Sequence, residues 1–112
     1  MVKFIEKGVF FVFKIKVPTK KIKEICQSLG EPYIIKVIDA ENVIYKNLND
    51  IYDFEISGLD NQRKSFNATV YVWQLKDSTR IIETIPNIRS LEDLKTTLEC
   101  ITDEYLELIK LS

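Results

Sequence analysis

The C-terminal end of the chain carries one continuous apolar stripe at helical spacing, and this stripe constrains the fold more than any other feature. Between Ser90 and Lys110, apolar residues recur at alternating steps of three and four. They are Leu91, Leu94, Leu98, Ile101, Tyr105 and Leu108. Ser90 and Asp93 have the spacing of a capping box, with Asp in place of the usual Glu or Gln. The other sides of this helix are acidic, so it must lay its stripe on another element.

Alternating apolar and polar residues upstream predict antiparallel strands with one apolar face. The predicted strands are 10–17, 33–39, 43–48, 51–57, 66–75 and 79–85, the last closed by Pro86. Thr19 is the expected N-cap of a short helix that ends at Gly30. The order predicts one α+β domain over residues 1–112, in which an antiparallel sheet of about six strands wraps around the long C-terminal helix. A homodimeric coiled coil is the alternative use of the stripe, although the stripe is short for one.

Composition and charge limit the classes of protein that the chain can belong to. The longest uncharged apolar runs, 8–13 and 67–75, are far shorter than the ~20 residues that cross a bilayer. No leader-type segment follows Met1, so we expect a cytoplasmic protein with no transmembrane segment. A net charge of −1 argues against general binding to nucleic acid. The first 30 residues nevertheless hold seven lysines and two glutamates, a face that serves solubility or contacts an anionic partner.

The residues that usually carry metal or covalent chemistry are scarce. The chain has no histidine, and its two cysteines, Cys26 and Cys100, lie far apart, so we expect no metal site and no cofactor. The cysteines are predicted to pack as small hydrophobes, the alternative being a disulfide between the two helices. Asp53 and Glu55 are expected to face solvent on a half-buried strand. Without histidine, a carboxylate, lysine or tyrosine would have to activate a nucleophile, and no pattern in the sequence indicates one, so we predict that the protein is not an enzyme.

The segment Phe11–Ile22, with its strand, proline and short helix, and the later helix from Ser90 to Lys110 resemble the START-like helix-grip (SRPBCC) superfamily. That superfamily includes small lipid carriers of thermoacidophiles, lipid-transfer domains and cyclase-like enzymes, and the chain is shorter than its typical members. Members curl an antiparallel sheet around a C-terminal helix and often hold an apolar ligand between the two. The resemblance lies in the order of the elements, and it implies an apolar binding site between sheet and helix.

The surfaces that face each other between sheet and helix are aromatic and aliphatic, which suits an apolar ligand. We predict a non-enzymatic binder or carrier of a fatty acid or similar lipid. An empty cavity of about 300 Å³ would cost roughly 7 kcal/mol of a total stability of about 5–15 kcal/mol. A pocket would therefore be small, occupied or shared between subunits, and a solid core is the alternative. The predicted lining is Phe11, Phe13, Ile15, Tyr52, Phe54, Val70, Val72, Leu94, Leu98, Ile101 and Tyr105.

Three large side chains, Tyr71, Trp73 and Leu75, alternate with the inward set and are predicted on the outer face of the sheet. Such a patch is typical of an association surface, so a homodimer through this strand is expected. If the strand has the opposite phase, these side chains face the core instead. The alternative function is therefore a homodimeric protein-interaction module with a solid core and no ligand.

Overall fold

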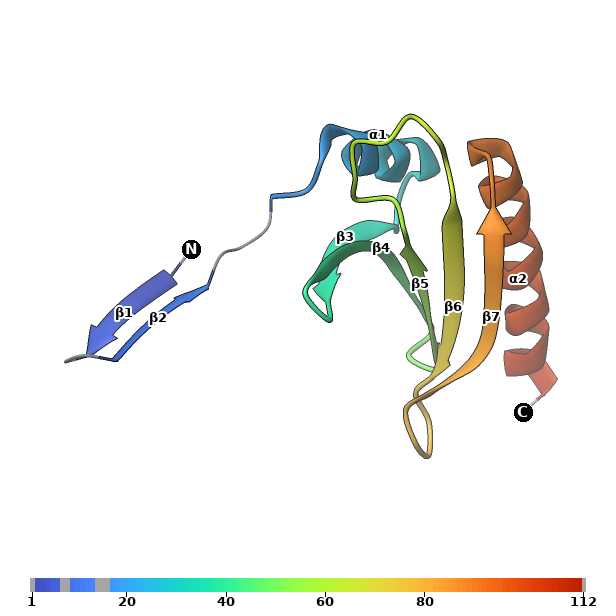
Figure 1. The fold of residues 1–112 in the computed structure, drawn as a ribbon. Helices are drawn as coiled ribbons and strands as arrows, with labels where there is room; N and C mark the ends of the chain where they lie inside the picture. Colours follow the sequence, from blue (N-terminus) through green and yellow to red (C-terminus); the bar gives the residue numbers. More distant parts are fainter. Residues whose placement is uncertain (1, 7–8, 14–16, 112) are drawn as a thin grey trace.

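The computed structural model describes the backbone of residues 2–6 and 9–13, and both backbone and side chains of residues 17–111. A five-stranded antiparallel sheet is its largest element. A short helix lies at one end of this sheet, a long C-terminal helix lies along one face, and a two-stranded hairpin lies to the side (Figure 1). The predicted α+β class is confirmed, but the main sheet has five strands among the described residues and not six.

The strands of the main sheet lie side by side in sequence order. They are β3 (Ile34–Ile38), β4 (Glu41–Leu48), β5 (Tyr52–Ser57), β6 (Ala68–Gln74) and β7 (Arg80–Ile88). Asp39 and Ala40 form the two-residue turn between β3 and β4, and both have a positive φ. That backbone matches the right-handed twist of the strands that it joins.

The last strand continues past Pro86, which was wrongly predicted to end it. Proline lacks the N–H that a central strand would need for its ladder. Because β7 is the edge strand of the described sheet, the missing donor can face away from β6. The chain then reaches Ile88, which is buried in the core.

The predicted strand 10–17 does not join the main sheet in the described residues. Instead, β2 (Val9–Phe13) pairs with β1 (Val2–Glu6) in an antiparallel hairpin, which Figure 1 draws apart from β3–β7. Residues 14–16 lie outside the described residues. Two apolar segments separated by only two residues pair locally because closing so short a loop costs little entropy. The six-strand prediction failed because it overlooked this upstream partner.

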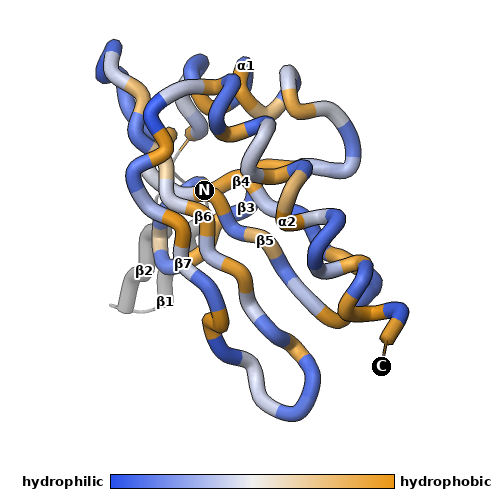
Figure 2. Tube along the Cα trace, turned by 90° about the vertical axis from the view of Figure 1, so that its right-hand side faces the viewer, coloured by the Kyte–Doolittle hydropathy of each residue, from blue (hydrophilic) through white to orange (hydrophobic). Residues whose placement is uncertain are grey.

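The predicted ends of both helices are confirmed. α1 (Lys20–Leu29) begins after Thr19, whose side chain accepts a hydrogen bond from the backbone N of Ile22, and it ends at Gly30, with φ 80°. α2 (Leu91–Leu111) begins after Ser90, whose Oγ accepts from the N of Asp93 at 3.0 Å. Apolar and polar residues alternate along α2 in Figure 2.

One member of the predicted stripe of α2 is misplaced. Leu108 is 46% exposed, whereas Ile109, four residues after Tyr105, packs against the core. A straight helix has 3.6 residues per turn, whereas alternating steps of three and four average about 3.5. Over several turns the buried face of the helix therefore moves away from the positions that this spacing predicts.

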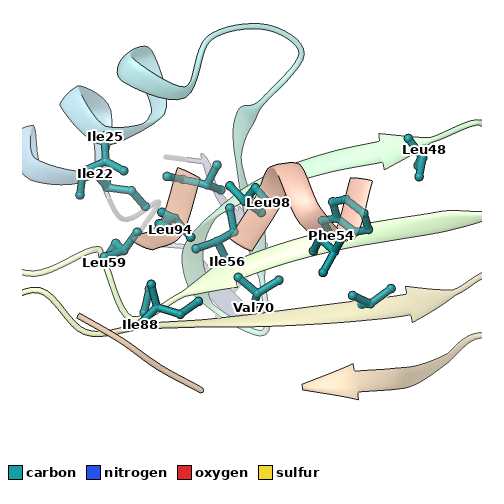
Figure 3. Close-up of a cluster of buried hydrophobic side chains, with 14 of the residues drawn as sticks. Ile22, Ile25, Leu48, Phe54, Ile56, Leu59, Val70, Ile88, Leu94 and Leu98 are labelled. Atoms are coloured by element: carbon teal, nitrogen blue, oxygen red, sulfur yellow. The ribbon is translucent and has the colours of Figure 1, made fainter. Parts of the chain in front are cut away.

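A single cluster of buried side chains joins α1, α2 and the inner face of the sheet, which we define as the face toward α2. Figure 3 shows Ile22 and Ile25 of α1 and Leu94 and Leu98 of α2 directed toward the strands. The sheet contributes Ile44, Leu48, Phe54, Ile56, Ala68, Val70, Val72 and Ile88. Burial of so many large apolar side chains, at about 1.5–3 kcal/mol each, is the main force holding α2 on the sheet.

Candidate functional site

Most of the side chains predicted to line a ligand cavity are brought together, but as the packed core. Phe54, Val70, Val72 and Leu94 are fully buried, and Tyr52 packs against the same cluster from its margin. Leu98, Ile101 and Tyr105 are exposed by 3%, 4% and 6%. Phe11 and Phe13 lie on β2, opposite Phe4 and Val2 of β1, and Ile15 lies outside the described residues.

The phenolic hydroxyl that could have anchored a ligand in the core already has a partner. Tyr105 donates a hydrogen bond from its hydroxyl to Oε1 of Glu83 on β7, at 2.6 Å. Burial, together with the Glu83 carboxylate, raises the pKa of Tyr105. The ring of Tyr105 lies 4.6 Å from that of Tyr52 and 6.0 Å from that of Phe54, centroid to centroid. This end of the core is thus closed by aromatic contacts.

A groove of about 390 Å³ opens beside the core, between the C-terminal end of α1, strand β4 and α2. Its apolar floor is formed by Leu29 and by Leu98, the one predicted lining residue found there. The remaining lining side chains are polar or charged: Ser28, Tyr33, Lys46, Lys95, Glu99, Thr102 and Asp103. We call this site the α1–α2 groove. It combines apolar surface with hydrogen-bonding groups, as small-molecule sites generally do.

Lys46 is the central polar group of the α1–α2 groove. It occupies an inner position of β4, opposite Phe54 of β5. Its Nζ lies 5.0 Å from the ring centroid of Tyr33 and 5.9 Å from that of Phe54, and it donates a long hydrogen bond of 3.4 Å to Oγ1 of Thr102. Partial burial lowers the pKa of Lys46. Among the described residues no carboxylate forms an ion pair with this ammonium group.

Tyr33 and Thr102 place two hydroxyl groups beside Lys46. Tyr33 precedes β3 and Thr102 lies on α2, so the groove unites residues far apart in the sequence. Burial raises the pKa of Tyr33, and its hydrogen bond with Thr102 acts in the opposite direction. An ammonium and two hydroxyls beside an apolar floor can bind a carboxylate that carries an apolar tail.

Charged residues of α2 border the groove on its solvent side. Lys95, Glu99 and Asp103 are exposed and succeed one another at steps of four along the helix. Because exposed charges are screened by water and salt, we expect them to contribute less to ligand binding than the partly buried Lys46.

Of the three predicted interface residues, Tyr71 and Trp73 lie on the outer face of the sheet, opposite α2. Tyr71 and Trp73 are paired there with Glu55 and Asp53 of β5, and both are half-buried. Leu75 follows β6, is half-buried and donates its backbone N–H to the carbonyl of Ile51 at 2.9 Å. Glu55, which was expected to face solvent, is only 8% exposed. That expectation was wrong because Trp73 shields the carboxylate and binds it.

The two cysteines are free thiols. Cys26 is half-buried, and its Sγ donates to the backbone carbonyl of Tyr33 at 3.5 Å. Cys100 is exposed, contrary to the prediction that it packs in the core, because its position on α2 lies outside the buried stripe. Burial raises the pKa of Cys26, which disfavours the reactive thiolate.

Sequence reasoning missed Lys46, Tyr33 and Thr102. One signal was present: in the predicted strand 43–48, Lys46 has the same alternation as Ile44 and Leu48, which are both apolar. A lysine at such a position is buried only when it serves a partner or lies at an opening. Tyr33 and Thr102 carried no comparable signal, because their proximity arises only when α1 and α2 pack on the same sheet.

Comparisons with family models, curated proteins and solved structures gave no match. Among the described residues, no helix is both long and apolar enough to span a bilayer. The same residues contain no group of three or more Cys, Asp or Glu side chains arranged to hold a metal ion.

Proposed function

We propose that the protein is a non-enzymatic binder of a small amphipathic carboxylate, such as a medium-chain fatty acid, in the α1–α2 groove. The ligand class follows from the resemblance of the sequence to helix-grip proteins, and the packed core favours the groove over the interior as the binding site. A ligand with one charged end and one apolar end matches the two kinds of surface that the groove offers.

The position of Lys46 is the observation that carries the proposal. A partly desolvated ammonium with no carboxylate partner among the described residues gains most from an added anion, because the cost of removing it from water is already included in folding. Leu29 and Leu98 then offer apolar surface to the tail. The expected pose has the carboxylate between Lys46 and Thr102.

The test is calorimetric titration of the protein with octanoate, octanol and octylammonium. We expect octanoate to bind and the other two to bind at least tenfold more weakly. Lys46→Met should reduce octanoate affinity by about 10- to 100-fold, because a charge-assisted hydrogen bond contributes about 1.5–3 kcal/mol. Methionine has a similar length and suits a partly buried position, so the fold should persist.

Lys36 provides the matched control. Its ammonium also lies over a tyrosine ring, 4.1 Å from the centroid of Tyr45, but on the outer face of the sheet. Lys36→Met should leave octanoate binding unchanged. Equal effects of the two substitutions, or equal binding of octanoate and octanol, would contradict a carboxylate site at Lys46.

A homodimeric interaction module remains the second proposal. It is supported by exposed aliphatic side chains on the outer face of the sheet: Ile34 of β3 is 52% exposed, and Ile81 of β7, which pairs with Trp73, is 43% exposed. Sedimentation equilibrium of the wild type and of Trp73→Ser tests it. A dimer that dissociates in the variant supports association through β6, and a monomeric wild type at tens of micromolar contradicts it.

A further inference from the structure

A second pocket lies on the outer face of the sheet, on the opposite side from the α1–α2 groove. It has a volume of about 300 Å³ and extends from the β3–β4 turn across β5 and β6 to β7. Its walls include four large apolar or aromatic side chains, Ile38, Tyr71, Trp73 and Ile81. Its polar lining consists of Asp39, Glu41, Glu55 and Ser57, with no lysine or arginine. We call this site the outer pocket.

Glu55 is the buried acidic group of the outer pocket. Its Oε1 accepts a hydrogen bond from Nε1 of Trp73 at 2.8 Å, whereas its Oε2 accepts none from the described residues. The side chain is 8% exposed, and no cation of the described part of the chain forms an ion pair with it. A carboxylate so placed lacks the charged partner that buried acids normally have.

Two further carboxylates strengthen the negative field around Glu55. Glu41 is held in place by a hydrogen bond of 3.1 Å that its Oε2 accepts from the backbone N of Gly58. Gly58 has a φ of 90°, and a Cβ there would lie 2.7 Å from the carbonyl oxygen of Asn67, so only glycine fits. Burial raises the pKa of Glu55, and the charges of Glu41 and Asp39 raise it further. All three acids therefore favour a positive ligand.

The walls determine what kind of cation fits. The carboxylates are not arranged as a metal site among the described residues, and aromatic and aliphatic side chains cover the rest of the pocket. The faces of tryptophan and tyrosine rings attract ammonium groups, while Ile38 and Ile81 offer contacts for carbon atoms. Aromatic rings beside carboxylates are suited to an ammonium group on an alkyl chain.

We propose that the outer pocket binds an alkylammonium ion, with the ammonium at Oε2 of Glu55 and the alkyl chain against Trp73 and Ile81. The same chemistry is offered by a free small amine and by the lysine side chain of another protein. The site lies on the opposite face of the sheet from Lys46, so it does not depend on the carboxylate proposal.

Trp73 is the only tryptophan of the chain, so intrinsic fluorescence reports directly from the pocket. The experiment titrates the full chain with n-butylammonium chloride, with n-butanol, and with sodium chloride at matched ionic strength. A saturable change in fluorescence with n-butylammonium alone is the expected result. The absence of saturation, or an equal response to sodium chloride or butanol, would overturn the proposal.

Variants locate the binding group. Glu55→Gln keeps an acceptor for Trp73 and should weaken n-butylammonium binding at least tenfold, whereas Glu92→Gln, at an exposed position of α2, should not change it. Glu41→Gln should weaken binding several-fold and serves as the second test if Glu55→Gln fails to fold. Unchanged affinity in a folded Glu55→Gln or in Glu41→Gln would refute the site.

A parallel titration with Nα-acetyl-lysine methylamide distinguishes the two sources of the ammonium group. Tighter binding than that of n-butylammonium indicates a lysine side chain, and weaker binding indicates a free amine.

Discussion

Ala40 has a backbone conformation that L-amino acids with side chains rarely adopt. It occupies the second position of the β3–β4 turn with a φ of 64°, after Asp39 with a φ of 51°. Asp tolerates this region better than alanine, because its short side chain can bond to the nearby backbone. The outer pocket begins at this turn, so the strained residue lies next to the residues that hold a ligand in our proposal.

Ala40→Gly is expected to stabilise the protein by up to about 1 kcal/mol. Glycine relieves the left-handed strain, about 1–2 kcal/mol, and this gain exceeds the greater freedom of glycine in the unfolded chain, about 0.5–1 kcal/mol. Urea denaturation measures the difference. A less stable variant would mean that the alanine methyl group makes contacts worth more than the strain.

Glu55 is expected to make stability depend on pH in a direction unusual for a carboxylate. Because its folded-state pKa is raised above the ordinary value, the folded chain holds the proton more tightly than the unfolded chain. The contribution of Glu55 is thus most favourable below the unfolded pKa, about 4.3, and declines as pH rises through the folded pKa. Urea denaturation between about pH 4 and pH 7 should show Glu55→Gln gaining stability relative to the wild type as pH rises. A difference that is constant with pH would count against the raised pKa.

At the scale of elements, α2 is attached to the sheet by apolar contacts and by polar links, one from Thr102 to Lys46 and one from Tyr105 to the edge strand β7. The apolar contacts involve the buried stripe that ends at Tyr105. The shorter of the two polar links is the hydrogen bond from the Tyr105 hydroxyl to Glu83, at 2.6 Å. Glu83 lies on the inner face, opposite Val72, so without Tyr105 its carboxylate would face the margin of the core.

Tyr105→Phe should destabilise the protein by about 1–3 kcal/mol, because the half-buried Glu83 carboxylate loses its donor. The ring contacts with Tyr52 and Phe54 remain in this variant, so the loss reports on the hydrogen bond alone. Thermal unfolding provides the measurement. Adding Glu83→Leu should recover much of the loss, and a double variant no more stable than Tyr105→Phe would refute the proposed cost.

At the scale of the whole molecule, the main sheet has two edges with unpaired backbone groups. β3 and β7 are these edges in the described part of the chain, and both carry exposed aliphatic residues. Such edges can pair with another strand. In the helix-grip resemblance a further strand belongs to the sheet, and residues 10–17 were predicted to supply it.

Amide hydrogen exchange should distinguish the edges from the centre. We expect the amides of β5 to exchange most slowly and the outward-directed amides of β7 to exchange orders of magnitude faster, because no strand of the described residues pairs with that edge. Protection of those β7 amides equal to that of β5 would show that another strand pairs with this edge. A dependence of this protection on protein concentration would identify a second copy as its source.

Local patterns in the sequence were sufficient for the helix ends, for five of the strands and for the inward face of α2 as far as Tyr105. Side-chain alternation and the capping positions of Thr19 and Ser90 depend only on residues within one strand or one helical turn. These residues are neighbours in the sequence, so the sequence alone is enough to predict them. Of the candidate site, only Leu98 could be predicted. Trp73 and Glu55 were assigned to the outer face, but their mutual burial was not foreseen.

The tertiary structure decided everything that depends on which elements meet. It determined whether Phe10–Phe13 pair with the main sheet or with Val2–Glu6, and it allowed Pro86 inside a strand because that strand is an edge. It also turned Lys46 from an exception in an apolar pattern into the centre of a groove between two helices. Contacts between distant segments depend on the combined packing of the sheet and both helices, and no run of neighbouring residues encodes them.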